Sequence, residues 1–331
     1  MMWTIRTLLT RMSRATRMQL PLFSVDQANA SFDSVSNQGA KDCSPCGSAR
    51  LSQLRLCVLG SGSGGNSAVV CQGASALVID LGLGPMTTAR RLVAAGMNLQ
   101  AIQAVCLTHL DQDHFRPTWV ATLLRSQIPI YLHRWHIHDL ASHAEGKRLQ
   151  KAGLVHLIDE EPFEPVDGYS VQAIRLPHDR KGTCGYRVVT SGGALGYATD
   201  LGHVPKQLIN AFTGVDLLAI ESNYDEQMQV QSGRPAFLKR RIMGRAGHLS
   251  NDQSFIAVRE ILDRGLASSL QHIVLLHRSN QCNHPSIVRH VFEEDPRLLG
   301  RITLAEQREI TPWICVDPNG SGHHEQLNLK F

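Results

Sequence analysis

The sequence predicts one α/β domain in which runs of strands mix with helices, preceded by a segment of different composition. From residue 54 onward, short apolar runs bounded by glycine, proline or polar residues recur as strands do, and helical patterns lie between them. The chain has 331 residues, 43% of them hydrophobic and 19% charged, which is typical of a soluble globular protein with a sizeable core. No apolar run approaches the roughly 18 residues of a membrane span, so we expect no membrane partner.

Residues 1–50 differ from the rest of the chain. They carry a net charge of +3 out of the total of +4, so the remaining residues are nearly neutral and charge alone does not indicate a nucleic-acid binder. An arginine-rich, acid-poor start resembles an organelle targeting segment, whereas Met12 and Met18 also allow a start site placed too early. We expect a basic, disordered segment at 1–50 and one folded domain at 51–331.

The folded part divides into alternating apolar runs and helical patterns. The runs that predict strands cover 54–60, 68–72, 75–82, 101–109, 128–133, 169–178, 185–190, 194–200, 215–222 and 272–277. The patterns that predict helices cover 87–96, 116–126, 135–153, 205–212, 234–244, 251–265 and 284–294. Gly96 marks the end of the first helix, and Pro117 suits the first turn of the second.

The glycines in "LGSGSGGNS" match the spacing of a dinucleotide-binding loop. Gly60, Gly62 and Gly65 give G-x-G-x-x-G after a strand, but that fingerprint requires a helix to begin at the third glycine. The residues that follow alternate and turn as a β-hairpin does, so we expect no dinucleotide cofactor. A loop of this kind could instead present backbone N–H groups to an anionic substrate at the rim of a site.

The cysteines do not indicate a disulfide framework. Five lie in apolar strand-like runs and are expected to be buried thiols in a reducing compartment, which we take to be the cytoplasm: Cys57, Cys71, Cys106, Cys184 and Cys315. Cys43 and Cys46 form a lone C-x-x-C, which without a second pair is a weak zinc or redox signal.

Polar residues that could bind metal close five of the predicted strands. Each is the first ionisable side chain after an apolar run: Asp80, His109, His178, Asp200 and His277. Strands of one sheet system that end in polar groups bring those groups to a common edge. The string "THLDQDH" adds Asp111, Asp113 and His114 directly after His109. Even without Asp80, seven such donors are too many for one tetrahedral ion and suit two metals roughly 3.5–4 Å apart.

The order of these motifs resembles that of the metallo-β-lactamase-fold hydrolases over about residues 54–295. Asp80 matches the first, orienting aspartate of that family, and "THLDQDH" matches H-x-H-x-D-H with Asp111 in place of the second histidine. His178 and Asp200 match the next two motifs. The strings "VLGSGSGGNS", "GHLSND" at 247–252 and "LLHRSNQCN" at 275–283 further resemble the YycJ/WalJ-type subgroup. The resemblance implies an αββα four-layer sandwich.

The same resemblance implies a set of ligands for each of two divalent metal ions. One ion would be held by His109, Asp111 and His178, and the other by Asp113, His114 and His277, with Asp200 bridging the two. Asp80, Asp113 and His248 are the expected catalytic residues. His248 is either a substrate contact or proton donor, or else a cap of the helix that Ser250 or Asn251 begins.

The resemblance implies a dinuclear metal-dependent hydrolase that uses a metal-bridging hydroxide, with a phosphodiester substrate, DNA or RNA, as the first candidate. Hydrolysis of a small ester, thioester or lactone on the same site, and a non-hydrolytic metal-binding or redox role, are the alternatives. The basic stretch 234–245 (Arg234, Lys239, Arg240, Arg241 and Arg245) is either a phosphate-contacting face or a solvated helix face.

Asp111 bears on which metal binds. Two divalent ions, the carboxylates of Asp113 and Asp200 and one hydroxide would leave one positive charge, which Asp111 neutralises. Carboxylate is a harder ligand than imidazole, so the site is expected to favour manganese or iron over zinc. A tolerated ligand exchange with zinc still bound is the alternative.

Overall fold

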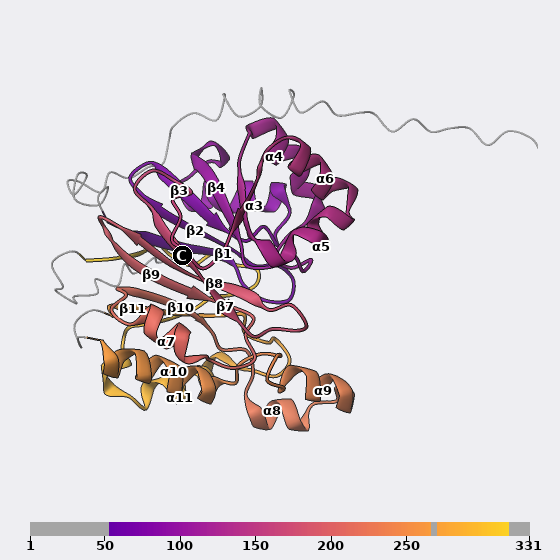
Figure 1. The fold of residues 1–331 in the computed structure, drawn as a ribbon. Helices are drawn as coiled ribbons and strands as arrows, with labels where there is room; N and C mark the ends of the chain where they lie inside the picture. The colour runs from indigo at the N-terminus through magenta and orange to yellow at the C-terminus, as the bar shows by residue number, and fades with distance from the viewer. Residues whose placement is uncertain (1–52, 266–269, 318–331) are drawn as a thin grey trace, which may run out of the picture. The chain divides into compact units, whose positions relative to one another are not determined.

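The computed structural model describes residues 53–265 and 270–317. The segment 1–50, including Cys43 and Cys46, lies outside the described residues. Two β-sheets face each other, and helices cover the outer face of each (Figure 1). Among the described residues, none of the helices has the length and apolar character needed to cross a membrane.

The first sheet has seven strands in the order β13-β1-β2-β3-β4-β5-β6. Its strands are β1 (Arg55–Gly60), β2 (Ser67–Gln72), β3 (Ser75–Ile79), β4 (Ile102–Leu107), β5 (Ile130–His133), β6 (Val155–Ile158) and β13 (Ile314–Cys315). β2 and β3 form an antiparallel hairpin, and β3 to β6 run parallel. The hairpin confirms that the glycine-rich loop is not followed by a dinucleotide-binding helix.

The second sheet has six strands in the order β12-β11-β10-β9-β8-β7. Its strands are β7 (Ser170–Leu176), β8 (Thr183–Thr190), β9 (Gly193–Ala198), β10 (Leu217–Glu221), β11 (His272–Leu276) and β12 (Ile302–Leu304). β9 to β12 run parallel, and β8 is antiparallel to both β7 and β9. Strands β7, β9, β10 and β11 therefore run in the same direction and end at the same edge of the sheet.

Helices enclose the two sheets. The helices are α3 (Pro85–Ala94), α4 (Val120–Ser126), α5 (Ile137–Ser142), α6 (Ala144–Lys151), α7 (Lys206–Phe212), α8 (Glu226–Gln231), α9 (Ala236–Ile242), α10 (Asn251–Arg264) and α11 (Pro285–Glu293). Apolar residues of α3 to α6 bury the outer face of the first sheet, and those of α7, α10 and α11 bury the outer face of the second. A third core lies between the sheets. This arrangement confirms the αββα sandwich.

A few elements differ from the sequence prediction. The helix expected at 135–153 is two helices, α5 and α6, because His143 between them has an extended backbone. The structure adds β6, β12, β13 and α8, which the sequence patterns did not indicate. Cys57, Cys71, Cys106 and Cys184 are buried as expected, whereas Cys315 is exposed in β13, so the expectation of a buried thiol was wrong there.

Candidate metal centre

Strand ends from both sheets bring the expected site residues to one edge of the sandwich. Asp80 follows β3 and His109 follows β4, while His178, Asp200 and His277 follow β7, β9 and β11. Asp80, Asp200 and His277 have left-handed backbones, with φ of 64°, 54° and 53°. Such a backbone is uncommon for residues other than glycine and is typically found where a functional geometry is imposed.

The side chains fall into overlapping groups that could each hold an ion. Within each group the ligand atoms lie within 4.8 Å of one another. The groups are His109, Asp111 and His178; Asp113, His114 and His277; and His109, His114 and Asp200. The third group shares a histidine with each of the others, so Asp200 lies between them. All seven expected ligands thus lie together, and their role as ligands remains a proposal.

The loop that carries Asp111 and Asp113 is fixed by a close backbone approach. Asp113 accepts a hydrogen bond from the Asn66 backbone N–H at 2.7 Å. A Cβ placed on Gly82 would come within 1.7 Å of the Asp113 carbonyl oxygen, so only glycine allows this approach. The glycine-rich loop and the metal-ligand loop are therefore built as one unit.

Partners outside the centre orient the histidine rings. The Nδ1 atom of His178 lies 2.9 Å from the Gly247 carbonyl oxygen, and that of His109 lies 3.0 Å from Thr108 Oγ1. A ring nitrogen engaged in this way leaves Nε2 to face the centre, as in most metal-binding histidines.

Asp80 contacts the candidate centre through His114. Its fully buried carboxylate accepts hydrogen bonds from the Thr108 backbone N–H at 2.8 Å and lies 2.7 Å from His114 Nδ1. Burial raises the pKa of the Asp80 carboxyl, against the lowering effect of His114. Asp80 therefore contacts a candidate ligand and is no member of the candidate ion groups.

The donor set fits divalent metal ions. The Nε2 atom of His277 is buried and has no hydrogen-bond partner, which leaves a donor site that an ion would satisfy. The nearest carboxylate oxygen, Asp113 Oδ2, is 3.6 Å away. Imidazole nitrogens together with carboxylate oxygens suit zinc, iron or manganese.

Glu221 was missed by the sequence analysis. It ends β10, is completely buried and lies 2.7 Å from His248 Nδ1 and 3.1 Å from His277 Nδ1. The signal was present, because Glu221 is the first ionisable residue after the apolar run of β10, as Asp200 is after β9. With Asp200, His248 and His277 it forms a further group of candidate ligand atoms.

His248 is not a helix cap. The Ser250 side chain caps α10 and forms a capping box with Gln253, so the capping alternative for His248 was wrong. His248 instead pairs with Glu221, and its Nδ1 lies 3.5 Å from Asp200 Oδ1. Its side chain is 20% exposed, which allows contact with a substrate.

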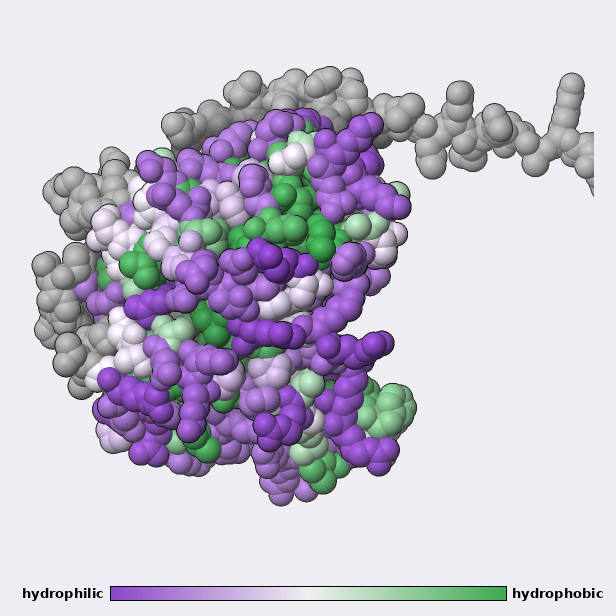
Figure 2. Space-filling view, in the orientation of Figure 1, coloured by the Kyte–Doolittle hydropathy of each residue, from purple (hydrophilic) through white to green (hydrophobic). Residues whose placement is uncertain are grey.

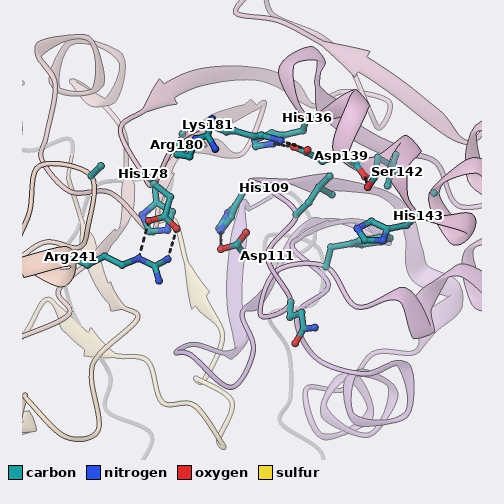
Figure 3. A pocket seen from close by; sticks show the side chains of 18 of the residues that line it. His109, Asp111, His136, Asp139, Ser142, His143, His178, Arg180, Lys181 and Arg241 are labelled. Carbon is teal, nitrogen blue, oxygen red and sulfur yellow. Dashed lines mark hydrogen bonds and ion pairs between the residues drawn. The ribbon is translucent and has the colours of Figure 1, made fainter. Parts of the chain in front are cut away.

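A cavity of about 1070 Å³ opens beside the centre. In Figure 3, His178 and Arg241 lie on one side, and Asp139, Ser142 and His143 lie on the other, with His109 and Asp111 between them. Five cations and four acidic residues line it: Arg180, Lys181, Arg240, Arg241 and Arg245, with Asp111, Asp139, Glu145 and Asp179. Arg241 is paired with Asp179 at 2.6 Å, and Lys181 is paired with Asp139.

Charge pairing in the metal-free centre predicts a pH dependence. Burial alone would lower the pKa of His277, but Asp200, Asp113 and Glu221 raise it to about 10. The pKa of His114 is also raised, since Asp200 and Asp80 outweigh its burial. The His277 imidazolium contributes stability that is fully present below about pH 6.5 and is lost as the pH rises toward 10, and the raised pKa of His114 acts in the same direction.

We therefore expect the melting temperature of the chelator-treated protein to fall by roughly 5 °C or more between pH 6.5 and pH 9.5. Burial lowers the pKa of His109, so His109 changes its charge below pH 6.5 and does not contribute to this fall. Scanning calorimetry checks the slope, with His277→Asn as the variant that should flatten it. A melting temperature that rises over this range would contradict the charge assignment.

Two facing sheets with a histidine–carboxylate centre at one edge define a metal-dependent hydrolase of the metallo-β-lactamase fold. The chain belongs to the β-lactamase superfamily, because the sequence model described as "Beta-lactamase superfamily domain" matches residues 76–267, more than half of its length.

Individual relatives agree with this family. The chain is 25% identical over 239 residues to exodeoxyribonuclease YycJ of Bacillus anthracis, which covers 71% of this chain and 86% of the relative. It is 24% identical over 251 residues to exodeoxyribonuclease WalJ of Streptococcus pneumoniae, covering 73% and 90%. The crystal structure of the metallo-β-lactamase-fold protein YhfI of Bacillus subtilis aligns with a TM-score of 0.56 at 14% identity, over 78% of this chain and 99% of that one.

Proposed function

We propose that this protein is a dinuclear metal-dependent phosphodiesterase that acts on nucleic acid, in the first place as an exodeoxyribonuclease. The observation that carries the proposal is the cavity directly beside the candidate metal centre, in which three of the five lining cations form no ion pair within the described residues: Arg180, Arg240 and Arg245. Lysine and arginine side chains at such a position suit the phosphates of a polynucleotide. The names of the similar YycJ and WalJ proteins support the same substrate class.

In this proposal the ligand groups are those expected from the sequence. His109, Asp111 and His178 would hold one ion, Asp113, His114 and His277 the other, and Asp200 would contact both. When bound, the ions would stabilise the charge that develops on phosphoryl oxygens and make water acidic enough to attack at neutral pH.

The chain's own residues would position the substrate and move a proton. Arg240 and Arg245 line the cavity and would hold phosphates near the centre. Glu221 occupies Nδ1 of His248, so Nε2 is the atom from which His248 would protonate the leaving oxygen. The buried thiols support a reducing compartment, the cytoplasm, as the proposed site of action.

The test is a substrate screen on protein loaded separately with zinc or manganese. We expect turnover of bis(4-nitrophenyl) phosphate and of labelled DNA, with RNA as a comparison, and no turnover of a thioester or lactone. Metal analysis of the same samples should give two ions per chain. Full metal occupancy with no phosphodiester turnover would refute the proposal, and thioester turnover alone would favour the small-ester alternative.

Asp111→His should move the metal preference toward zinc. The Asp111 side chain is 57% exposed, with Oδ2 3.8 Å from His109 Nε2, so imidazole can replace it without repacking the core. Imidazole is a softer ligand than carboxylate, and the substitution removes one negative charge from the site. Competitive loading with equal zinc and manganese, followed by elemental analysis, should show a higher zinc fraction in the variant than in the wild type. Equal fractions would support a tolerated ligand exchange.

A further inference from the structure

The helix that carries two of the cavity-lining arginines also carries an exposed aromatic residue. Phe237 on α9 is 68% exposed, which is unusual for a phenylalanine. A single exposed apolar residue needs no explanation by itself. The position of Phe237 is informative, because Arg240 and Arg241 follow at helical spacings of three and four residues and so lie on the same face of the helix.

The same face of α9 leads into the cavity. Arg240, Arg241 and Gly244, which continue this spacing, all line the cavity, as does Arg245 just beyond the helix. The space-filling view shows the molecule hollowed between α5–α6 and α9, with apolar surface on the α8–α9 pair beside the hollow (Figure 2). A path of one aromatic ring and three guanidinium groups therefore runs from the surface to the candidate metal centre.

The arginines on this path differ in what they already bind. Arg241 is engaged with Asp179, the neighbour of His178, and so fixes the cavity wall. Arg240 and Arg245 are both exposed, and neither forms an ion pair within residues 53–265 and 270–317. They are available to phosphates.

We propose that Phe237 stacks on a base of a single-stranded DNA end while Arg240 and Arg245 contact its phosphates on the way to the metal centre. This assignment rests on the proposed nuclease function. Proteins that hold unpaired strands combine a basic track with aromatic rings, since every unpaired base offers a flat face for stacking. In a duplex only the terminal base pair has an unstacked face, so an aromatic ring beside the cavity favours an unpaired end, in which every base can stack on the ring.

Phe237→Ala is the principal test, read by direct binding as well as turnover. Fluorescence anisotropy with a labelled oligothymidine and chelator-treated protein should show binding weakened by about 5- to 100-fold, as expected for one lost base stack. The matched control is Val230→Ala on α8, where the side chain is 58% exposed but lies off the arginine face. Phe237→Trp should bind at least as well as the wild type.

A probe without bases separates stacking from a general loss of binding. An oligonucleotide made of abasic sites should bind wild type and Phe237→Ala equally. Arg240→Gln should weaken the binding of both oligonucleotides. It should also reduce the slope of log binding constant against log salt concentration by roughly 0.7, the value for one phosphate contact on a single strand. Arg125→Gln, at an exposed arginine of α4, is its control and should leave the slope unchanged.

The outcomes distinguish the two proposals. Equal binding of oligothymidine by wild type and Phe237→Ala would overturn the stacking proposal, whatever the activity. A change of oligomeric state in Phe237→Ala with unchanged DNA binding would also overturn it and identify a protein contact. Absence of bis(4-nitrophenyl) phosphate turnover from the wild type would count against the nuclease function, whereas DNA binding by Phe237→Ala tests the stacking proposal alone.

Discussion

Asp200→Asn should lower phosphodiester turnover by about 10³- to 10⁴-fold, because it removes a negative charge from the point where the candidate ion groups meet. Asp200 Oδ2 lies 2.8 Å from His114 Nε2, and Oδ1 lies 3.4 Å from His277 Nδ1. Asparagine keeps the shape but neutralises the ligand, and ion stabilisation of the reacting phosphoryl group is worth several kcal/mol, at about 1.4 kcal/mol per tenfold in rate.

The loss should be equal for DNA and for bis(4-nitrophenyl) phosphate, since Asp200 belongs to the centre and not to the DNA path. Elemental analysis should also show fewer than two ions per chain. Asp252→Asn is the control, because Asp252 is an exposed aspartate in the first turn of α10. Activity of Asp200→Asn within threefold of the wild type would refute the placement of Asp200 between the ions.

The sequence predicted the centre because one local rule applies to every strand that feeds it. A buried strand is an apolar run, and the first ionisable residue at its end lies at the edge of the sheet, as Asp200 does after β9. Glu221 obeys the same rule. It was missed because "LLAIE" was treated only as a strand, although its carboxylate is as buried as the run before it.

Other features depend on contacts that no local pattern contains. The cavity wall is held by Arg241 and Asp179, which are 62 residues apart in sequence. β13 has only two residues and pairs with β1 from the far end of the chain, and a run that short has no measurable periodicity. At the break between α5 and α6, His143 is neither glycine nor proline, so the sequence contains no helix-breaking signal there.

Glu221→Gln should reduce kcat on DNA by about 10- to 100-fold, the usual cost of removing a partner that orients an active-site histidine. Besides His248 and His277, the carboxylate accepts a hydrogen bond from the Leu201 backbone N–H at 2.9 Å, so it ties the β9 end to the His248 loop. Glutamine retains the shape but has only one acceptor oxygen, whereas both oxygens of Glu221 accept, one from His248 and the other from the backbone N–H groups of Leu201 and Leu249. With the amide oxygen turned toward those backbone donors, the NH₂ group faces His248 Nδ1 and cannot accept its hydrogen bond, so the ring loses the partner that fixes its tautomer.

The leaving group decides whether this loss reflects proton donation or general damage. DNA cleavage releases an alkoxide, which needs a proton, whereas 4-nitrophenolate leaves as a stable anion. Glu221→Gln and His248→Ala should therefore slow DNA hydrolysis strongly while changing turnover of bis(4-nitrophenyl) phosphate less than about threefold, and the double variant should be no worse than His248→Ala. Equal losses on both substrates would mean that Glu221 acts by holding His277 and the metal centre in place, and would remove His248 from the proton-transfer step.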